Sequence, residues 1–181
     1  KDEEQTAYLD ISTVSGLKSL KPYEMNPRVA SSYGTGELIQ DAISHGARNI
    51  ILGLGGSASI DLGIGILRAL GYLFLDENGR EIPLFSPGFL AKIKHIQRSH
   101  SIPKIRFTCL CDVKNPFLGE NGAVNVFGSQ KGLGLHELES FEKTCAQVIE
   151  LLLKKSKQKW ADKEGFGAAG GVALGLGLFF E

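Results

Sequence analysis

The stretch Asn49-Ile-Ile-Leu-Gly-Leu-Gly-Gly-Ser-Ala-Ser-Ile-Asp61 decides the fold. It begins as a short, continuously apolar run, which is typical of a strand covered on both faces of a sheet. A glycine-rich turn then leads into residues 61–70, whose apolar side chains have helical spacing and which Gly71 closes. Ahead of the strand, residues 36–45 form another helical pattern that ends at Gly46. Helix, strand, glycine turn and helix in this order predict an α/β fold.

Further segments extend this alternation along the chain. Residues 105–113 form a second strand pattern, and residues 135–155 form the longest amphipathic helix pattern. Residues 72–76 and 81–84 flank an Asn-Gly pair, which favours a tight hairpin turn. We therefore expect a three-layer α/β/α architecture with a mixed, mainly parallel sheet, and a single α/β domain across residues 1–181.

Charge and cysteine content narrow the classes of function. Twenty basic residues balance twenty acidic ones, so the chain lacks the net positive charge expected of a protein that binds nucleic acid or an acidic membrane. No apolar run reaches the roughly 18 residues of a membrane-spanning helix. Cys109 and Cys111 alternate within the second strand pattern, which predicts small buried residues in a reducing compartment. We expect a cytoplasmic protein, and neither nucleic acid nor membrane as a partner.

Glycines concentrate in three blocks, of which the first carries the clearest chemistry. Backbone N–H groups at Gly55 and Gly56, with the hydroxyls of Ser57 and Ser59, suit an anion at the start of a helix. Asp61 follows, and a carboxylate there suits a divalent cation or a proton. Two plainer interpretations stay open: Asp61 complements the helix start, or the turn binds nothing. The blocks cover residues 53–71, 119–134 and 165–177.

The same turn also fits a dinucleotide fingerprint. Gly53-x-Gly55-x-x-Ala58 matches that pattern, and Asp76 lies at about the right distance to bind a ribose, which would make the protein an NAD-dependent oxidoreductase. Against this, a hairpin pattern rather than a full βαβ unit follows Tyr72. Gly165-x-Gly167-x-x-Gly170 also matches, but it follows a polar stretch. A Walker A loop is excluded, because no Gly-Lys-Ser/Thr follows the turn.

The second glycine block follows polar residues that close the strand pattern 105–113. Open α/β sheets bind ligands at the carboxyl ends of their strands, so Asp112 and Asn115 could recognise a metal ion or a hydroxyl group. A simple turn before Pro116 is the alternative. Lys131 lies between glycine-rich turns and suits a phosphate or carboxylate, unless it is an ordinary surface lysine.

Five motifs resemble those of the bacterial glycerate kinase family, in the family's order. They are Met25-Asn-Pro-Arg-Val-Ala-Ser-Ser-Tyr-Gly-Thr-Gly-Glu-Leu-Ile39, Leu52-Gly-Leu-Gly-Gly-Ser-Ala-Ser59 with Asp61, Cys111-Asp-Val-Lys-Asn-Pro116, Phe127-Gly-Ser-Gln-Lys-Gly132 and Gly167-Ala-Ala-Gly-Gly171. The resemblance covers nearly the whole chain. Leu62 stands where the family has glycine, and Ser129 stands where it has proline.

The resemblance implies the inserted second domain of a two-domain kinase. The family's Ala-Pro-Asp-Ser-Phe-Lys and Gly-Glu-Gly segments are absent, so most of the first domain would be missing. Both ends of the chain also look cut, since it lacks an initiator methionine and ends within the apolar run Leu178-Phe-Phe-Glu181. The missing first domain is therefore an expected partner.

The implied reaction transfers the γ-phosphoryl group of ATP, with Mg²⁺, to a hydroxyl of D-glycerate. Asp61 and Asp112 would divide the roles of metal ligand and catalytic base. A phosphate or the glycerate carboxylate would be bound by Gly55, Gly56, Ser57, Ser59, Arg28, Asn115 and Lys131. The fragment alone is expected to be inactive. A structural domain without a ligand is a third hypothesis, beside the kinase and the oxidoreductase.

Overall fold

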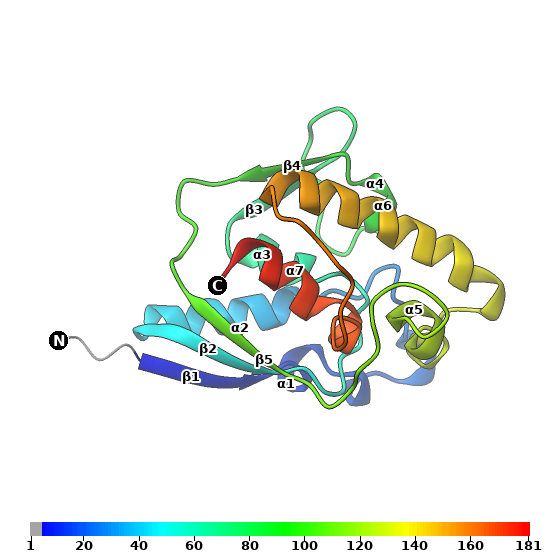
Figure 1. The fold of residues 1–181 in the computed structure, drawn as a ribbon, viewed down its shortest axis with the longest axis horizontal. Helices are drawn as coiled ribbons and strands as arrows, with labels where there is room; N and C mark the ends of the chain where they lie inside the picture. Colours follow the sequence, from blue (N-terminus) through cyan, green and yellow to red (C-terminus); the bar gives the residue numbers. More distant parts are fainter. Residues whose placement is uncertain (1–4) are drawn as a thin grey trace.

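A computed structural model describes residues 5–181 and contains a central parallel sheet (Figure 1). Strand β2 lies in the middle and pairs with both neighbours, so that Leu52 aligns with Leu9 on one side and with Cys109 on the other. A separate antiparallel pair is formed by two later strands. The mixed α/β fold with a mainly parallel sheet is therefore confirmed. The strands are β1 (Gln5–Asp10), β2 (Ala47–Gly53) and β5 (Arg106–Leu110) in the sheet, and β3 (Tyr72–Leu75) and β4 (His95–Arg98) in the pair.

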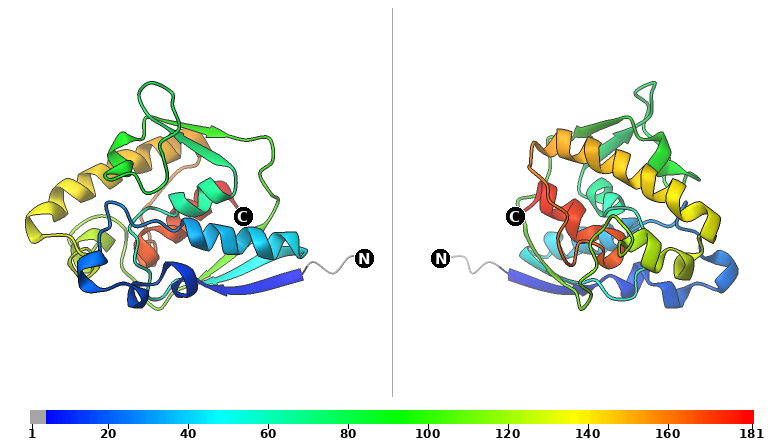
Figure 2. Two further views of the ribbon diagram at one scale, coloured as in Figure 1. Left: turned by 180° about the vertical axis from the view of Figure 1, so that it is seen from behind. Right: turned by 45° about the vertical axis from the view of Figure 1, so that its right-hand side comes forward.

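Helices gather on one side of the sheet. Helix α2 packs against α3 and β2, α7 packs against α3 and β5, and α6 packs against α7 and β4. Figure 2 shows α3, α6 and α7 on the same side of the sheet in two further views. None of the helices within residues 5–181 is both long and apolar enough to cross a membrane. The helices are α1 (Ser12–Ser15), α2 (Tyr33–Ser44), α3 (Ile64–Ala69), α4 (Phe89–Lys92), α5 (Ala123–Phe127), α6 (Leu138–Ser156) and α7 (Val172–Phe179), with short 3-10 turns η1 (Leu17–Ser19), η2 (Pro22–Glu24), η3 (Ser129–Lys131), η4 (Leu135–Glu137) and η5 (Ala168–Gly170).

The two faces of the parallel sheet differ in exposure. On the helical face, Ile50 and Leu52 of β2 are 1% and 0% exposed and belong to one continuous hydrophobic core. On the other face, Tyr8 of β1 is 76% exposed and Leu110 of β5 is 55% exposed. Within residues 5–181 the sheet therefore has a helical layer on one face, and the second layer of the expected α/β/α arrangement is not formed by this part of the chain.

The expected hairpin strand 81–84 is wrong. The turn itself forms, because Asp76 Oδ1 accepts hydrogen bonds from the N–H groups of Asn78 and Arg80. Pairing then stops after one bridge between Leu75 and Glu81, and β3 pairs with β4 instead. Pro83 explains the stop, since proline has no N–H to continue a ladder.

The turn before α3 has an unusual backbone at Leu62. Its φ is +56°, and the following Gly63 has a φ of +69°, so both residues are left-handed and α3 begins at Ile64 rather than at Asp61. A leucine pays a steric cost there that glycine would avoid. The Leu62 side chain is 0% exposed, so its burial in the core offsets that cost. This accounts for the glycine of the family at the position that Leu62 occupies here.

Ser129, the second departure from the family, is explained by its place. It is the first residue of η3, with Gly128 before it. The N–H at the first position of a helix has no helical acceptor, which is why proline is well tolerated there. Exchange between proline and serine therefore removes no helical hydrogen bond.

At Leu62, a glycine substitution should leave the protein more stable than an alanine substitution, which is the reverse of the usual order inside a fold. Both lose the buried side chain, but only alanine keeps the left-handed strain, so Leu62→Gly should be more stable than Leu62→Ala by about 1 kcal/mol. Leu67, buried inside α3, is the matched control, and there alanine should be more stable than glycine by about 1 kcal/mol. Urea unfolding of the four variants measures both orders. If the alanine variant were more stable than the glycine variant at both positions, the backbone strain at Leu62 would be contradicted.

Candidate functional site

The first glycine block forms a turn at the carboxyl end of β2. Leu54 N–H donates to the carbonyl of Leu110, so the turn starts beside the end of β5. Its far side is held by the segment after α1, where Leu17 N–H donates to Gly56 O at 2.8 Å. Gly55 and Gly56 are exposed, and within residues 5–181 their N–H groups donate to no acceptor. The turn thus presents two consecutive donors to solvent.

Lys131 binds the same turn through hydrogen bonds from its buried ammonium group. Its Nζ donates to Ser57 Oγ at 2.9 Å and to the carbonyl of Ser59 at 2.7 Å. The side chain is only 7% exposed, and this burial lowers the pKa of Lys131 to about 8, although the nearby carboxylate of Asp61 acts in the opposite direction. The structure therefore brings Lys131, Ser57 and Ser59 together, and Lys131 is not an ordinary surface lysine.

Asp61 lies deeper still, where it organises the backbone. Its carboxylate is 1% exposed and accepts five hydrogen bonds. Oδ2 accepts from the N–H and the hydroxyl of Ser32, at the start of α2, and from Gly65 N–H. Oδ1 accepts from Ser59 Oγ and Gly63 N–H. This geometry favours the plainer interpretation, in which Asp61 satisfies helix-start donors. Its expected roles as metal ligand and base stay predictions.

A cleft of about 160 Å³ opens over this turn. It is lined by Gly55, Gly56, Ser57 and Lys131 from the first two glycine blocks, and by Asp112 from the end of β5. Asp112 is exposed, so its carboxylate can be reached by a ligand. The cleft therefore joins backbone donors, one hydroxyl, one ammonium and one carboxylate at the carboxyl ends of two parallel strands, where open α/β sheets bind ligands.

A larger cleft lies at the opposite ends of the strands. It measures about 870 Å³ and is lined in part by Arg48, Arg106 and Glu181. None of the site residues expected from the sequence lines it. We therefore place the candidate site in the smaller cleft, which is lined by five of the expected residues, Gly55, Gly56, Ser57, Asp112 and Lys131.

The third glycine block also reaches the candidate site. Ala168 and Ala169 line the cleft, and Ala169 has a left-handed φ of +50°. A Cβ on Gly170 would lie 2.3 Å from the carbonyl oxygen of Ser59, so only glycine permits this approach. A Cβ on Gly167 would lie 2.4 Å from the carbonyl oxygen of Pro116, just ahead of the second block. The three blocks therefore pack together around the cleft.

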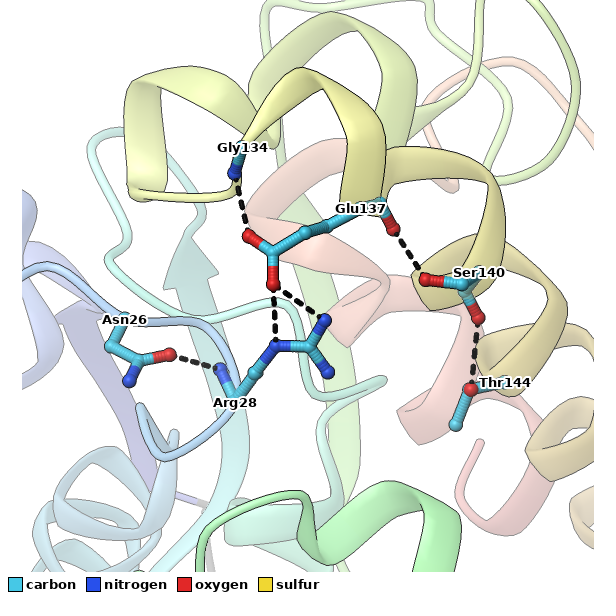
Figure 3. A network of polar contacts seen from close by, with 6 residues as sticks. All are labelled: Asn26, Arg28, Gly134, Glu137, Ser140 and Thr144. Atoms are coloured by element: carbon cyan, nitrogen blue, oxygen red, sulfur yellow. Dashed lines mark hydrogen bonds and ion pairs between the residues drawn. The ribbon is translucent and has the colours of Figure 1, made fainter.

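Arg28 and Asn115 lie outside the cleft. Figure 3 shows the guanidinium of Arg28 directed at Glu137, with Nη2 2.8 Å from Oε1. The N–H of Gly134, and next the Arg28 side chain, lower the pKa of Glu137. Asn115 donates through Nδ2 to the carbonyl of Asn121 and so closes a turn. Substrate binding by Arg28 and Asn115 stays a prediction, and this arrangement gives each of them a structural contact instead.

The expectation of two buried cysteines in the strand is wrong for Cys111. β5 ends at Leu110, so Cys111 lies beyond the ladder and is exposed at the edge of the cleft. Cys109 is half-buried, and its burial, with a smaller effect of Cys111, raises the pKa of the Cys109 thiol to about 11. Cys145 in α6 is buried, and burial raises its pKa as well.

The cleft does not contain a ready-made multi-carboxylate metal site. Across residues 5–181 there is no cluster of three His, Cys, Asp or Glu side chains that could hold a metal ion. Mg²⁺ commonly needs only one or two protein carboxylates, because waters and substrate phosphates supply its other ligands. The exposed carboxylate of Asp112 fits that limited role.

Sequence reasoning missed Gln130 and the backbone of Ala168 and Ala169 as parts of the cleft. Gln130 directly precedes Lys131 and is exposed, which gave no signal beyond its neighbour. The Gly-Ala-Ala-Gly-Gly run has no reactive side chain, but such small residues permit close backbone contact. From these small residues, close packing of the third block against the other two could have been predicted.

The dinucleotide interpretation lacks its βαβ unit. β3 follows α3 but forms its ladder with β4 and does not join the parallel sheet. Asp76, the expected ribose ligand, uses Oδ1 to accept two backbone N–H groups of its own turn. In the described parallel sheet, the strand directly after α3 does not lie next to β2, so Asp76 is not positioned beside the glycine turn.

The buried ammonium of Lys131 should make stability depend on pH. The folded pKa of about 8 lies below the ordinary value of 10.5, so between these values the unfolded chain binds more protons. The penalty for burying the charge is fully present below pH 8 and is relieved as the pH rises. Relative to Lys131→Met, the free energy of unfolding of the unsubstituted protein should increase by about 3 kcal/mol over this range. Urea unfolding at both ends measures the difference; a constant difference would contradict a desolvated ammonium.

Removing the Asp61 carboxylate should destabilise the fold. Asp61→Ala leaves buried donors at Ser32, Gly63 and Gly65 without an acceptor, so the free energy of unfolding should fall by about 3–5 kcal/mol. Asp112→Ala is the matched control, because this exposed aspartate should change stability by less than about 0.5 kcal/mol. Chemical denaturation measures both variants. Equal stability of the two would overturn the structural role of Asp61.

Comparison with known proteins agrees with the motif pattern. A model of the glycerate kinase family matches residues 1–181. The chain is 38% identical over 178 residues to glycerate 2-kinase of Escherichia coli K12, covering 97% of this chain and 46% of that protein. Identity to glycerate kinase of Bacillus subtilis is 35% over 180 residues, covering 98% of this chain and 47% of the relative.

A solved structure shows the same fold. The crystal structure assigned as glycerate kinase 2 from Salmonella typhimurium LT2 matches with a TM-score of 0.87 and 33% identity, covering 96% of this chain and 47% of that chain. The chain spans about half the length of the relatives it matches. These relatives are named as kinases, which gives the oxidoreductase interpretation no support. The chain belongs to the glycerate kinase family.

Proposed function

We propose that a longer protein containing this chain transfers the γ-phosphoryl group of ATP to a hydroxyl of D-glycerate. The observation that carries the proposal is the cleft over the first glycine block, where free N–H groups and the Lys131 ammonium face an exposed carboxylate. Family membership supplies the reaction class, and the cleft supplies groups that suit it. In this reaction the glycerate oxygen bonds to phosphorus, the bond to the ADP oxygen breaks, and the hydroxyl proton leaves.

The chain's own groups would mainly bind and neutralise charge. The N–H groups of Gly55 and Gly56 can donate to a phosphate or to the glycerate carboxylate. Ser57 already accepts from Lys131, so its hydroxyl hydrogen is available to the same anion. Lys131 donates two of its three ammonium hydrogens to Ser57 and Ser59. Its positive charge favours an anion in the cleft.

Ser59 is proposed as a positioning residue. Its carbonyl accepts from Lys131, and its hydroxyl donates to Asp61, so both polar groups hold neighbouring residues in place. Asp112 is proposed as the Mg²⁺ ligand, because its carboxylate is exposed at the cleft. Mg²⁺ would supply charge neutralisation at the phosphates. The role of catalytic base stays a prediction for the two aspartates.

The other half of the protein is proposed to complete the active site. The cleft is small and open, and the chain spans about half of the relatives' length. A nucleotide and a hydroxy acid need more contacts than this cleft provides. The chain of 181 residues is therefore proposed to bind an anion without turning over, and a cytoplasmic location stays a prediction.

The Asp112 carboxylate should be needed for turnover but not for folding. In the longer protein, Asp112→Asn should lower kcat by about 100-fold or more, because the metal loses a charged ligand. Glu120→Gln is the control, since Glu120 is exposed on the same segment and does not line the cleft. Turnover is measured with glycerate, ATP and Mg²⁺ in a coupled assay that follows ADP formation by a change in absorbance. Thermal melting of each variant checks that it is folded.

Two outcomes would count against this proposal. Near-normal turnover and Mg²⁺ dependence in Asp112→Asn would remove Asp112 from the metal site. Robust turnover by the 181-residue chain alone would show that its own groups suffice for the reaction, contrary to the proposed division between two halves.

A further inference from the structure

One face of the parallel sheet is exposed and carries both apolar and polar side chains. In a sheet, residues that align across neighbouring strands point to the same face. Tyr8, Ile51 and Thr108 form one such row, and Asp10, Gly53 and Leu110 form the next. We call these six residues the open face.

Exposure separates the open face from its opposite side. Leu52, one residue further along β2 than Ile51, is 0% exposed beneath the helices. On the open face Tyr8 is 76% exposed and Leu110 is 55% exposed, while Ile51 is half-buried between its neighbours in the sheet. The central strand β2 therefore places an apolar side chain on each face, Ile51 on one and Leu52 on the other, but residues 5–181 cover only the face of Leu52.

This asymmetry conflicts with the general behaviour of parallel sheets. All-parallel sheets occur almost only with both faces covered, and their central strands are correspondingly apolar throughout. The run of isoleucines and leucine in β2 has that character. Tyr8 and Leu110 are exposed on the two strands that flank β2. These side chains gain free energy when a second layer removes them from water.

We propose that the open face is the docking surface for the part of the longer protein that lies outside residues 1–181. The relatives are about twice as long as this chain, so the family has enough additional polypeptide to supply a second layer. The alternating apolar and polar residues, from Tyr8 and Leu110 to Asp10 and Thr108, suit a contact within one protein, since such interfaces are more polar than a core.

The end of the chain places a continuation close to this surface. Phe107 N–H of β5 donates to the carbonyl of Glu181 at 2.7 Å, and Phe180 has an extended backbone. Any polypeptide that follows Glu181 therefore starts beside the sheet. The inference rests on the proposal that a longer chain contains these residues, but not on the reaction that this chain catalyses.

Hydroxyl-radical footprinting of the longer protein tests the proposal without any substitution. Tyr8 and Tyr23 are a matched pair, at 76% and 77% exposed, and Leu110 can be compared with the exposed Leu135. If the open face is covered, Tyr8 should be oxidised about tenfold more slowly than Tyr23, with Leu110 similarly protected relative to Leu135. Mass spectrometry of the peptides gives each rate.

Repeating the footprinting at several protein concentrations decides which molecule covers the open face. Protection that is the same from dilute to concentrated protein supports docking within one chain. Protection that grows with concentration would assign the face to a second copy, and equal oxidation of Tyr8 and Tyr23 would show an open surface; either result overturns the proposal. The glycerate kinase assay is separate, so a protein that is inactive but protected would refute only the proposed function.

Discussion

The carboxylate of Asp61 is the interaction on which the arrangement of the site depends. Five donors from α2, from the first glycine block and from the start of α3 converge on its two oxygens. Because the group is buried, each donor that it accepts would otherwise be left unsatisfied in a dry interior. The position of Ser59, and with it the carbonyl that receives the Lys131 ammonium, follows from this carboxylate.

Glycine has a different purpose in the first and the third block. In the first, it exposes backbone donors at Gly55 and Gly56. In the third, it allows the backbone at Gly170 to approach Ser59 more closely than any side chain would permit. The charged side chains of the cleft come from the second block and from the end of β5, through Lys131 and Asp112, and the first block adds the Ser57 hydroxyl. A small cleft with several polar groups is possible because so little of its wall is occupied by side-chain volume.

Local patterns predicted much of the fold, and long-range contacts explain the rest. The apolar run of β2, the helix closed at Gly46 and the long α6 were evident from composition and period. The partner of β3 was not, because a strand 20 residues away competes with the hairpin once Pro83 ends it. At the site, residue types indicated an anion cleft, but no pattern revealed that Arg28 pairs with Glu137, or that Asp61 faces inward. Burial and partners are set by tertiary packing, which the local sequence does not encode.

The order of the strands also constrains how the polypeptide can be made. β2 leaves the ribosome long before β5, and the Asn49 and Arg106 side chains that meet across these two strands are separated by 57 positions. Sheets built from such distant partners close large loops and form slowly. Until residues 106–110 have been synthesised, one edge of the apolar strand β2 has no partner in the nascent chain. Until then, this unpaired apolar edge is prone to association with other exposed chains.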